Sequence, residues 1–172
     1  MVSSRLSRLA GMALAAVCAI LPATVHAATQ RVAFPGYSSG TIIVKTSERR
    51  LYLTLGDGTA LRYPVAVGMR GKQWSGEARV DGKYVEPAWS PPAEVKRAKP
   101  SIPNVIPPGP NNPMGARAIT LNRGEYAIHG TTNGMRASIG SAASFGCIRM
   151  YNEDVIDLYE RVSVGTPVYV VP

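Results

Sequence analysis

The sequence is poor in the residue types that do most catalytic chemistry, with two cysteines and two histidines among 172 residues. One of each, Cys18 and His26, falls in the first 27 residues, so the rest of the chain holds one thiol, Cys147, and one imidazole, His129. A single cysteine cannot form an internal disulfide, and one Cys with one His falls short of the three or four ligands of a zinc site. We therefore expect neither a disulfide nor a bound metal beyond residue 27.

Long hydrophobic runs are also scarce. The one apolar run, residues 9–21, is near 13 residues, follows Arg5 and Arg8, and precedes Pro22 and a small-residue site ending at Ala27. A membrane span needs about 20 such residues, and this pattern is typical of a cleaved secretory signal peptide. We predict a signal peptide over residues 1–27 and no stable membrane span.

The predicted export places the mature protein outside the cytoplasm. A lipid-modified Cys18 is the alternative, but this residue lies inside the apolar run, so cleavage after Ala27 fits better. Removing 27 of 172 residues leaves 145, which suits a single domain over residues 28–172. We expect that domain to be a monomer.

Acidic residues are few, 11 against 19 Lys and Arg, giving a net charge of +8, or +6 without Arg5 and Arg8. The basic residues are scattered rather than gathered on one helix among aromatics, and an exported protein meets little nucleic acid. We therefore expect no nucleic-acid partner. The positive charge suits solubility or an anionic envelope polymer.

Strand patterns dominate the first half. Residues 41–45 are apolar, residues 50–55 alternate, "GDGT" at 56–59 is typical of a hairpin turn, and residues 61–67 resume the strand. This predicts an antiparallel meander. A second, weaker hairpin is predicted around Asp81 and Gly82, and "TPVYVV" predicts a closing strand.

Residues 91–113 hold eight of the fourteen prolines. Proline donates no ladder hydrogen bond, so this segment is predicted to be a long surface loop with one helical turn over residues 93–98. Loops of this length in compact domains are often functional, and we hypothesise that this one lies over the site as a lid.

The last third alternates short strands and helices. Two strands joined around Asn122 to Gly124 are predicted, the second ending at His129, and "MRASIGSAAS" suits a helical turn. Residues 151–162 form the clearest helix, with Asn152 as N-cap. Its apolar stripe comprises Val155, Ile156, Leu158, Tyr159 and Val162.

Cys147 and His129 are the candidate reactive pair. A thiol is a good nucleophile only as the thiolate, and a neighbouring imidazole can take its proton. Eighteen residues separate the two, enough chain to fold back and bring them together. The alternatives are a Cys that is a small buried hydrophobe and a His that is a hydrogen-bonded structural residue.

Two further residues suit acyl transfer. The backbone amides of Gly146 and Cys147 can point at a developing oxyanion, because glycine permits close approach. In an extended segment Arg149 lies on the same side as Cys147, where its guanidinium suits a substrate carboxylate. The alternative for Arg149 is an ion pair with Glu153 or Asp154.

The run "IHGTTNGMRASIGSAASFGCIRMYNEDVIDLYERV" resembles the signature of the L,D-transpeptidase catalytic domain family. That family carries a His-Gly-Thr segment, a Ser-Ile-Gly turn, a Ser-His-Gly-Cys-Ile-Arg-Met block and an Asn-Glu-Asp-Val helix in this order. The strands around "RRLYLTLGDGTALRYPVAVG" resemble the family's opening meander. The likeness therefore extends over most of the mature chain.

The resemblance implies a mainly β, sandwich-like fold with one C-terminal helix packed on the sheet, a location in the periplasm or cell wall, no cofactor, and peptidoglycan stem peptides as partner. It implies that Cys147 attacks the meso-diaminopimelate carbonyl of a tetrapeptide stem, releases D-Ala, and passes the acyl group to an acceptor amine. His129 would be the base and the Gly130 carbonyl would orient its ring. Ser144, Gly146 and Arg149 fall on the family's site-lining positions.

One position departs from the family pattern, which usually has His immediately before Gly-Cys where this chain has Phe145. If the segment is extended, the Phe145 ring lies beside Cys147. An apolar neighbour disfavours the thiolate, so we predict a less depressed thiol pKa than in relatives with His there.

The sequence is also compatible with three other functions. An L,D-carboxypeptidase or a protein-to-peptidoglycan attaching enzyme would share the first half-reaction and differ in the acceptor. A non-catalytic wall-binding module is the alternative from another class.

Overall fold

The structure, a computed structural model, describes residues 29–172, so the predicted signal peptide lies outside the described residues. Strands dominate, with two α-helices, α1 (Ala93–Ala98) and α2 (Asn152–Arg161), and one 3-10 helix, η1 (Asn133–Ser138). No helix within residues 29–172 is long and apolar enough to cross a membrane. The strands are β1 (Gln30–Ala33), β2 (Ile42–Lys45), β3 (Arg50–Thr54), β4 (Thr59–Pro64), β5 (Val67–Gly68), β6 (Gly76–Val85), β7 (Arg117–Leu121), β8 (Ala127–His129), β9 (Ala142–Ser144), β10 (Ile148–Arg149) and β11 (Pro167–Val171).

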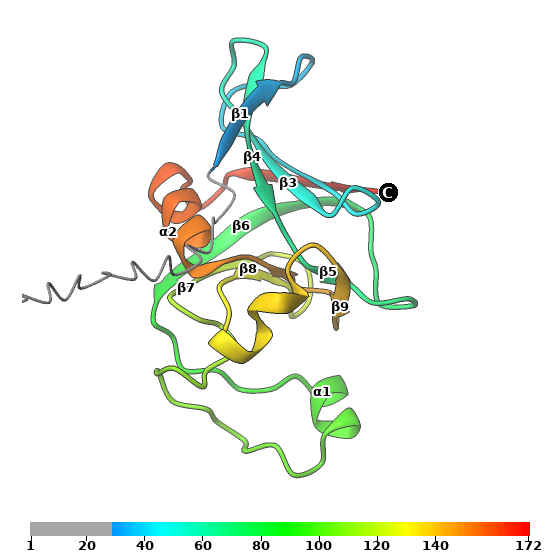
Figure 1. The fold of residues 1–172 in the computed structure, drawn as a ribbon, viewed down its shortest axis with the longest axis vertical. Coiled ribbons are helices and arrows are strands. Elements are labelled where there is room, and N and C mark those ends of the chain that lie inside the picture. Colours follow the sequence, from blue (N-terminus) through cyan, green and yellow to red (C-terminus); the bar gives the residue numbers. More distant parts are fainter. Residues whose placement is uncertain (1–28) are drawn as a thin grey trace, which may run out of the picture.

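Nine strands form one sheet in the order β1-β4-β3-β2-β11-β6-β7-β8-β10, and β5 pairs with β9 in a small second sheet. The predicted meander is confirmed, because β2, β3 and β4 pair antiparallel in sequence order. The closing strand β11 lies between β2, to which it is parallel, and β6. Figure 1 shows the β1 end and the α1 end at opposite poles of the molecule.

The long strand β6 joins the two halves of this sheet. Its first half pairs with β11 and its second half with β7, with a register shift between Val80 and Gly82. The hairpin predicted around Asp81 and Gly82 is therefore wrong. Both halves of β6 find pairing partners, so the Asp-Gly pair is absorbed as an irregularity within one strand.

The main core lies between the two halves of the sheet and α2, as expected for a sandwich-like mainly β fold. Side chains from β2, β3, β6, β7, β8, β10, α2 and β11 meet in one buried cluster. A small cluster around Ile43 and Tyr52 covers the other face of the first half. A third cluster, with Met114, Ala118 and Ala127, covers the other face of the second half.

Helix α2 packs on the sheet through Val155, Leu158 and Val162, which are all buried. Ile156, predicted in the same stripe, is instead 36% exposed. The predicted N-cap, Asn152, is also wrong: the helix begins at Asn152 and Tyr151 holds the cap position without a side-chain bond. The Asn152 amide is used elsewhere, on the loop that follows β8.

The proline-rich segment forms an ordered arch that carries α1, whose bounds match the prediction. A bridge between Trp89 and Ile106 closes it. The side chain of Asn112 is 2% exposed and donates to the carbonyls of Pro87, Ile106 and Pro107 at 2.9, 3.0 and 3.0 Å, so one amide links both ends of the arch.

Candidate active site

Strands β8 and β10 place the predicted pair on one face of the sheet. They are parallel neighbours, with Ile148 beside Ile128 and Arg149 beside His129. Successive strand residues point to opposite faces, and Ile128 and Ile148 point into the main core. His129 and Arg149 therefore face the other way, and Cys147, one residue before Ile148, packs with the third cluster on that face.

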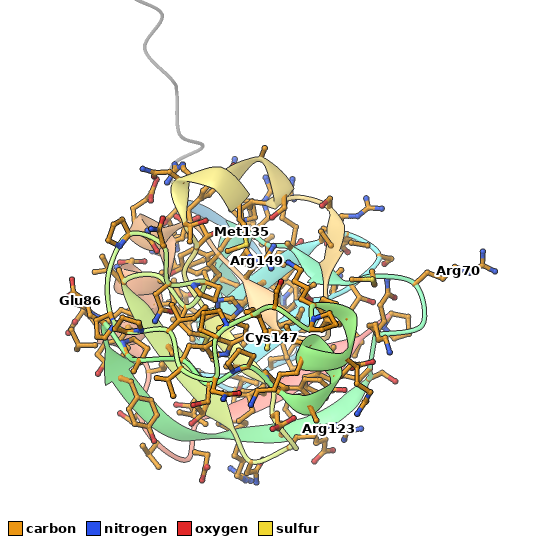
Figure 2. The ribbon with its side chains drawn as sticks, turned by 90° about the horizontal axis from the view of Figure 1, so that it is seen from below. Arg70, Glu86, Arg123, Met135, Cys147 and Arg149 are labelled. Atoms are coloured by element: carbon orange, nitrogen blue, oxygen red, sulfur yellow. The ribbon has the colours of Figure 1, made fainter. Side chains whose placement is uncertain are left out.

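That face is the floor of a cavity of about 700 Å³. Cys147, His129, Ser144, Phe145 and Arg149 all line it. Residues of the arch form its roof: Trp89, Pro92, Glu94, Val95, Lys99, Ile102 and Ile106. Figure 2 looks onto this side, with Cys147 near the centre, Arg149 next to it and the green arch crossing the view. The arch thus lies over the cavity in the position that a lid would take.

The His129 ring is 4% exposed and its Nδ1 lies 2.8 Å from the carbonyl oxygen of Gly130. Because a carbonyl only accepts, Nδ1 carries the proton, and the other ring nitrogen is left as the acceptor. Burial and, to a smaller extent, the positive charge of Arg149 lower the pKa of His129 to about 4, against the carbonyls of Gly130 and Pro113, which favour the charged ring. The imidazole is therefore neutral at pH 7 and able to take a proton.

The Cys147 side chain is half-buried and is the one free thiol in the described residues. Its hydrogen-bond contact is the carbonyl oxygen of Glu125, at 3.9 Å. Burial raises the pKa of the thiol, although the Ala127 amide and the charge of Arg149 oppose that rise. The resting pair is therefore a neutral thiol and a neutral imidazole. In this rotamer the thiol is directed at the Glu125 carbonyl, whereas transfer of its proton to His129 needs the sulfur within hydrogen-bond reach of the ring.

A tight turn precedes the thiol. The Ser144 hydroxyl accepts from the Gly146 amide at 3.0 Å and donates to the Cys147 carbonyl at 2.6 Å. The Ser144 hydroxyl thus uses both its donor and its acceptor capacity inside the turn, and Ser144 is 2% exposed. Contact of this hydroxyl with substrate stays a prediction. Gly146 has a φ of +121°, which an L side chain rarely adopts.

Phe145 lies at the bend of this turn rather than in an extended segment. Strand alternation therefore does not place Phe145 on the same face as Cys147, because the positive φ at Gly146 interrupts the alternation. The ring lines the same cavity nonetheless. That Phe145 makes the surroundings of the Cys147 thiol less polar stays a prediction.

Arg149 is held from the side of η1. One of its terminal nitrogens donates to the Ser138 hydroxyl at 2.8 Å, and its Nε is buried without a hydrogen-bond partner in the described residues. Glu153, one of the two ion-pair partners considered for it, forms its ion pair with Arg136 at 2.7 Å. A guanidinium that faces a cavity with an unused donor suits an anionic group.

Three residues that build this site were not among the predicted site residues. Asn152 Oδ1 accepts from the amides of Ala116 and Thr131 at 3.1 and 3.0 Å, and its Nδ2 donates to the Thr131 carbonyl at 2.9 Å. Asn152 thereby fixes the segment that orients His129. The Asn-Glu-Asp-Val block was the one signal in the sequence that pointed to Asn152. Asn112 fixes the arch, and Trp74 contacts the turn before Cys147.

The residues described contain no group of three or more His, Cys, Asp or Glu side chains placed to hold a metal ion. What the arrangement offers is a thiol, a neutral imidazole oriented by a backbone carbonyl, and an arginine in one roofed cavity. These are the parts of a cysteine acyltransferase site.

Comparison with known proteins agrees with this class. The L,D-transpeptidase catalytic domain family matches residues 39–170, and the chain belongs to that family. The probable L,D-transpeptidase YbiS of Escherichia coli strain K12 is 37% identical over 158 residues, covering 87% of this chain and 46% of the relative. The chain thus spans about half the length of the curated relatives it matches.

Solved structures share the fold. An L,D-transpeptidase from Mycobacterium smegmatis superposes with a TM-score of 0.61 at 17% identity, over 77% of this chain and 58% of that one. A Brucella melitensis protein described as a probable carnitine operon oxidoreductase is 43% identical, with a TM-score of 0.55, over 83% of this chain and 92% of that one.

Proposed function

We propose that this chain is an L,D-transpeptidase acting on peptidoglycan stem peptides, with Cys147 as nucleophile and His129 as general base. The observation that carries the proposal is the placement of both side chains on one face of β8 and β10, lining one cavity. The family match over residues 39–170 supports the same reaction class.

The first half-reaction moves one proton and one acyl group. The neutral His129 ring takes the proton of the Cys147 thiol as the sulfur bonds to the meso-diaminopimelate carbonyl carbon. The carbonyl electron pair moves onto its oxygen, where the Cys147 amide can donate. When the C–N bond breaks, His129 returns its proton to the leaving amine of D-Ala, and a thioester remains on Cys147.

In the second half-reaction the side-chain amine of another stem attacks the thioester. His129 accepts the proton of that amine and returns it to the departing Cys147 sulfur. The product is a 3→3 cross-link between two stems. Because the resting pair is neutral, each half-reaction passes one proton through His129, the first from the thiol to D-Ala and the second from the acceptor amine to the sulfur.

The substrate has a free carboxylate, which suits the buried, partly unpaired guanidinium of Arg149 on the same face of the sheet. Phe145 adds an apolar wall to the cavity. The protein acts after export, as the leader-like residues 1–27 predict.

Mass spectrometry of reaction products tests the proposal. Residues 28–172 are incubated with disaccharide-tetrapeptides, and cross-linked dimers plus free D-Ala are expected, with none from Cys147→Ala. Tripeptide monomers alone would assign an L,D-carboxypeptidase. Binding to peptidoglycan without any product, unchanged in Cys147→Ala, would point to a non-catalytic wall-binding module.

A further inference from the structure

The backbone immediately before Cys147 is held by an indole from a distant part of the chain. Trp74 Nε1 donates to the carbonyl oxygen of Gly146 at 3.0 Å. Trp74 lies in the segment between β5 and β6, 72 residues before Gly146. A partly buried indole directed at one backbone carbonyl of the turn fixes the orientation of that peptide group.

The indole is itself held in place by two neighbours. It stacks on the Tyr126 ring with centroids 5.1 Å apart and an interplanar angle of 3°, and the Arg123 guanidinium lies 5.0 Å from its ring centre. The same Tyr126 ring lies against Gly146, where a Cβ would come within 2.4 Å of Tyr126 Cε1. Trp74 and Tyr126 thus pack the turn from one side.

Trp74 lies on the core side of the turn. Trp74 and Tyr126 both pack against the main hydrophobic cluster; Tyr126 also lines the cavity, whereas Trp74 is not among the described residues that line it. The Gly146 carbonyl, which points at Trp74, therefore points away from the cavity. In a planar trans peptide the following N–H points opposite to the C=O, so the Cys147 amide is directed to the cavity side.

The Gly146 amide is already committed to the Ser144 hydroxyl. The Cys147 amide is then the backbone donor next to the sulfur that can stabilise an oxyanion. The orientation of this donor depends on the Gly146–Cys147 peptide plane, which Trp74 holds at the Gly146 carbonyl, while Ser144 holds the two flanking peptide groups at the Gly146 amide and the Cys147 carbonyl.

We infer that Trp74 is a positioning residue for acyl transfer: its indole N–H fixes the Gly146–Cys147 peptide so that the Cys147 amide faces the carbonyl oxygen of the substrate. The inference rests on the proposed function, because an oxyanion forms only if Cys147 attacks a carbonyl. Trp74 acts through the backbone and contacts no substrate.

The test compares two reactions of the same thiol. A carbapenem acylates Cys147 through an oxyanion, whereas iodoacetamide alkylates it by displacement at carbon without one. Trp74→Phe keeps an aromatic ring on Tyr126 and removes the N–H. We expect acylation to slow about tenfold, the effect of one neutral hydrogen bond, and alkylation to stay within about twofold.

The matched control is Tyr63→Phe, which also deletes one aromatic hydrogen-bond donor, here to Asp157 at 2.6 Å on the far side of the core. It should leave both rates unchanged. Trp74→His, which restores a ring N–H, should recover part of the acylation rate at an unchanged alkylation rate.

Each possible result either supports or overturns the positioning role of Trp74. Equal acylation rates in wild type and Trp74→Phe would overturn the inference, and so would acylation and alkylation that fall together, because the turn would then have moved as a whole. A wild-type protein that is alkylated but never acylated would overturn the proposed function, and the inference with it.

Discussion

Arg149 on β10 lies directly beside His129 on β8, in register, and its positive charge helps to keep the imidazole neutral. Burial is the larger cause, so the ring is held in the form that can accept a proton. The same charge favours the Cys147 thiolate. One arginine therefore acts on both partners of the proton transfer: it favours loss of the proton from the Cys147 sulfur and disfavours a protonated His129 ring.

Arg149→Gln should raise the pKa of His129 from about 4 toward 6.5, because one of its two lowering causes is removed. A protein without residues 1–27 contains a single imidazole, so its ring proton resonances can be followed by NMR against pH. An unchanged pKa would contradict the role of Arg149. Arg136→Gln, which removes an exposed cation that pairs with Glu153, serves as the control.

Alkylation of Cys147 should accelerate with pH and show no plateau near neutrality. Burial raises the pKa of the thiol above its ordinary value, so the thiolate is scarce at pH 7 and its fraction grows as pH rises. The measurement is the rate with iodoacetamide from pH 6 to 10, with glutathione as reference thiol. A rate that is already constant below pH 7 would refute the neutral resting pair.

Phe145→His offers a matched variant for the same measurement. Replacing the apolar ring, which lines the same cavity as the thiol, by an imidazole should lower the thiol pKa and raise the alkylation rate at pH 7. The prediction fails if the two pH profiles coincide, which would mean that Phe145 does not affect the surroundings of the sulfur.

The free energy of unfolding should fall in mild acid. His129 binds a proton with a pKa of about 4 in the folded chain and 6.5 in the unfolded chain, so the unfolded state gains protons first as pH drops. The stability present above pH 6.5 is therefore lost progressively toward pH 4, by about 3 kcal/mol. Urea unfolding at several pH values measures this. His129→Gln should flatten the slope in that window, and an equally steep slope in the variant would contradict the assignment.

Asn112→Ala should loosen the arch over the cavity. It removes the donors to Pro87, Ile106 and Pro107 and the acceptor of the Met114 amide at 2.9 Å, and unpaired buried carbonyls cost about 1–3 kcal/mol. Hydrogen exchange across residues 87–114 should quicken, and the KM for stem peptides should rise. Asn104→Ala, at an exposed position of the same loop, should change neither.

Local patterns predicted the parts of the fold that depend on local chemistry. The meander followed from alternation and the "GDGT" turn, and α1 follows from a non-proline stretch between prolines. The sharing of a face by His129 and Arg149 needed the pairing of β8 with β10, which no local pattern contains. The sequence alone indicated Cys147 and His129 through the rarity of Cys and His and through the family resemblance of the residues around them.

The failures have physical causes of the same kind. Asp81 and Gly82 make a good turn in isolation, but β7 and β11 supply pairing partners on either side and β6 runs through. Asn152 looks like an N-cap, yet its amide bonds with Thr131. Trp74 reaches Gly146 across 72 residues, so tertiary packing alone reveals its role.

The most direct test of the account is the intact mass of the protein during turnover. With a tetrapeptide stem and no acceptor, we predict a covalent adduct of one tripeptide acyl group, equal to the substrate minus D-Ala, located on Cys147 by peptide mapping, together with one equivalent of free D-Ala. Cys147→Ala should carry no adduct. An adduct on any other residue, or D-Ala release that persists in Cys147→Ala, would contradict the assignment of Cys147 as the acyl carrier.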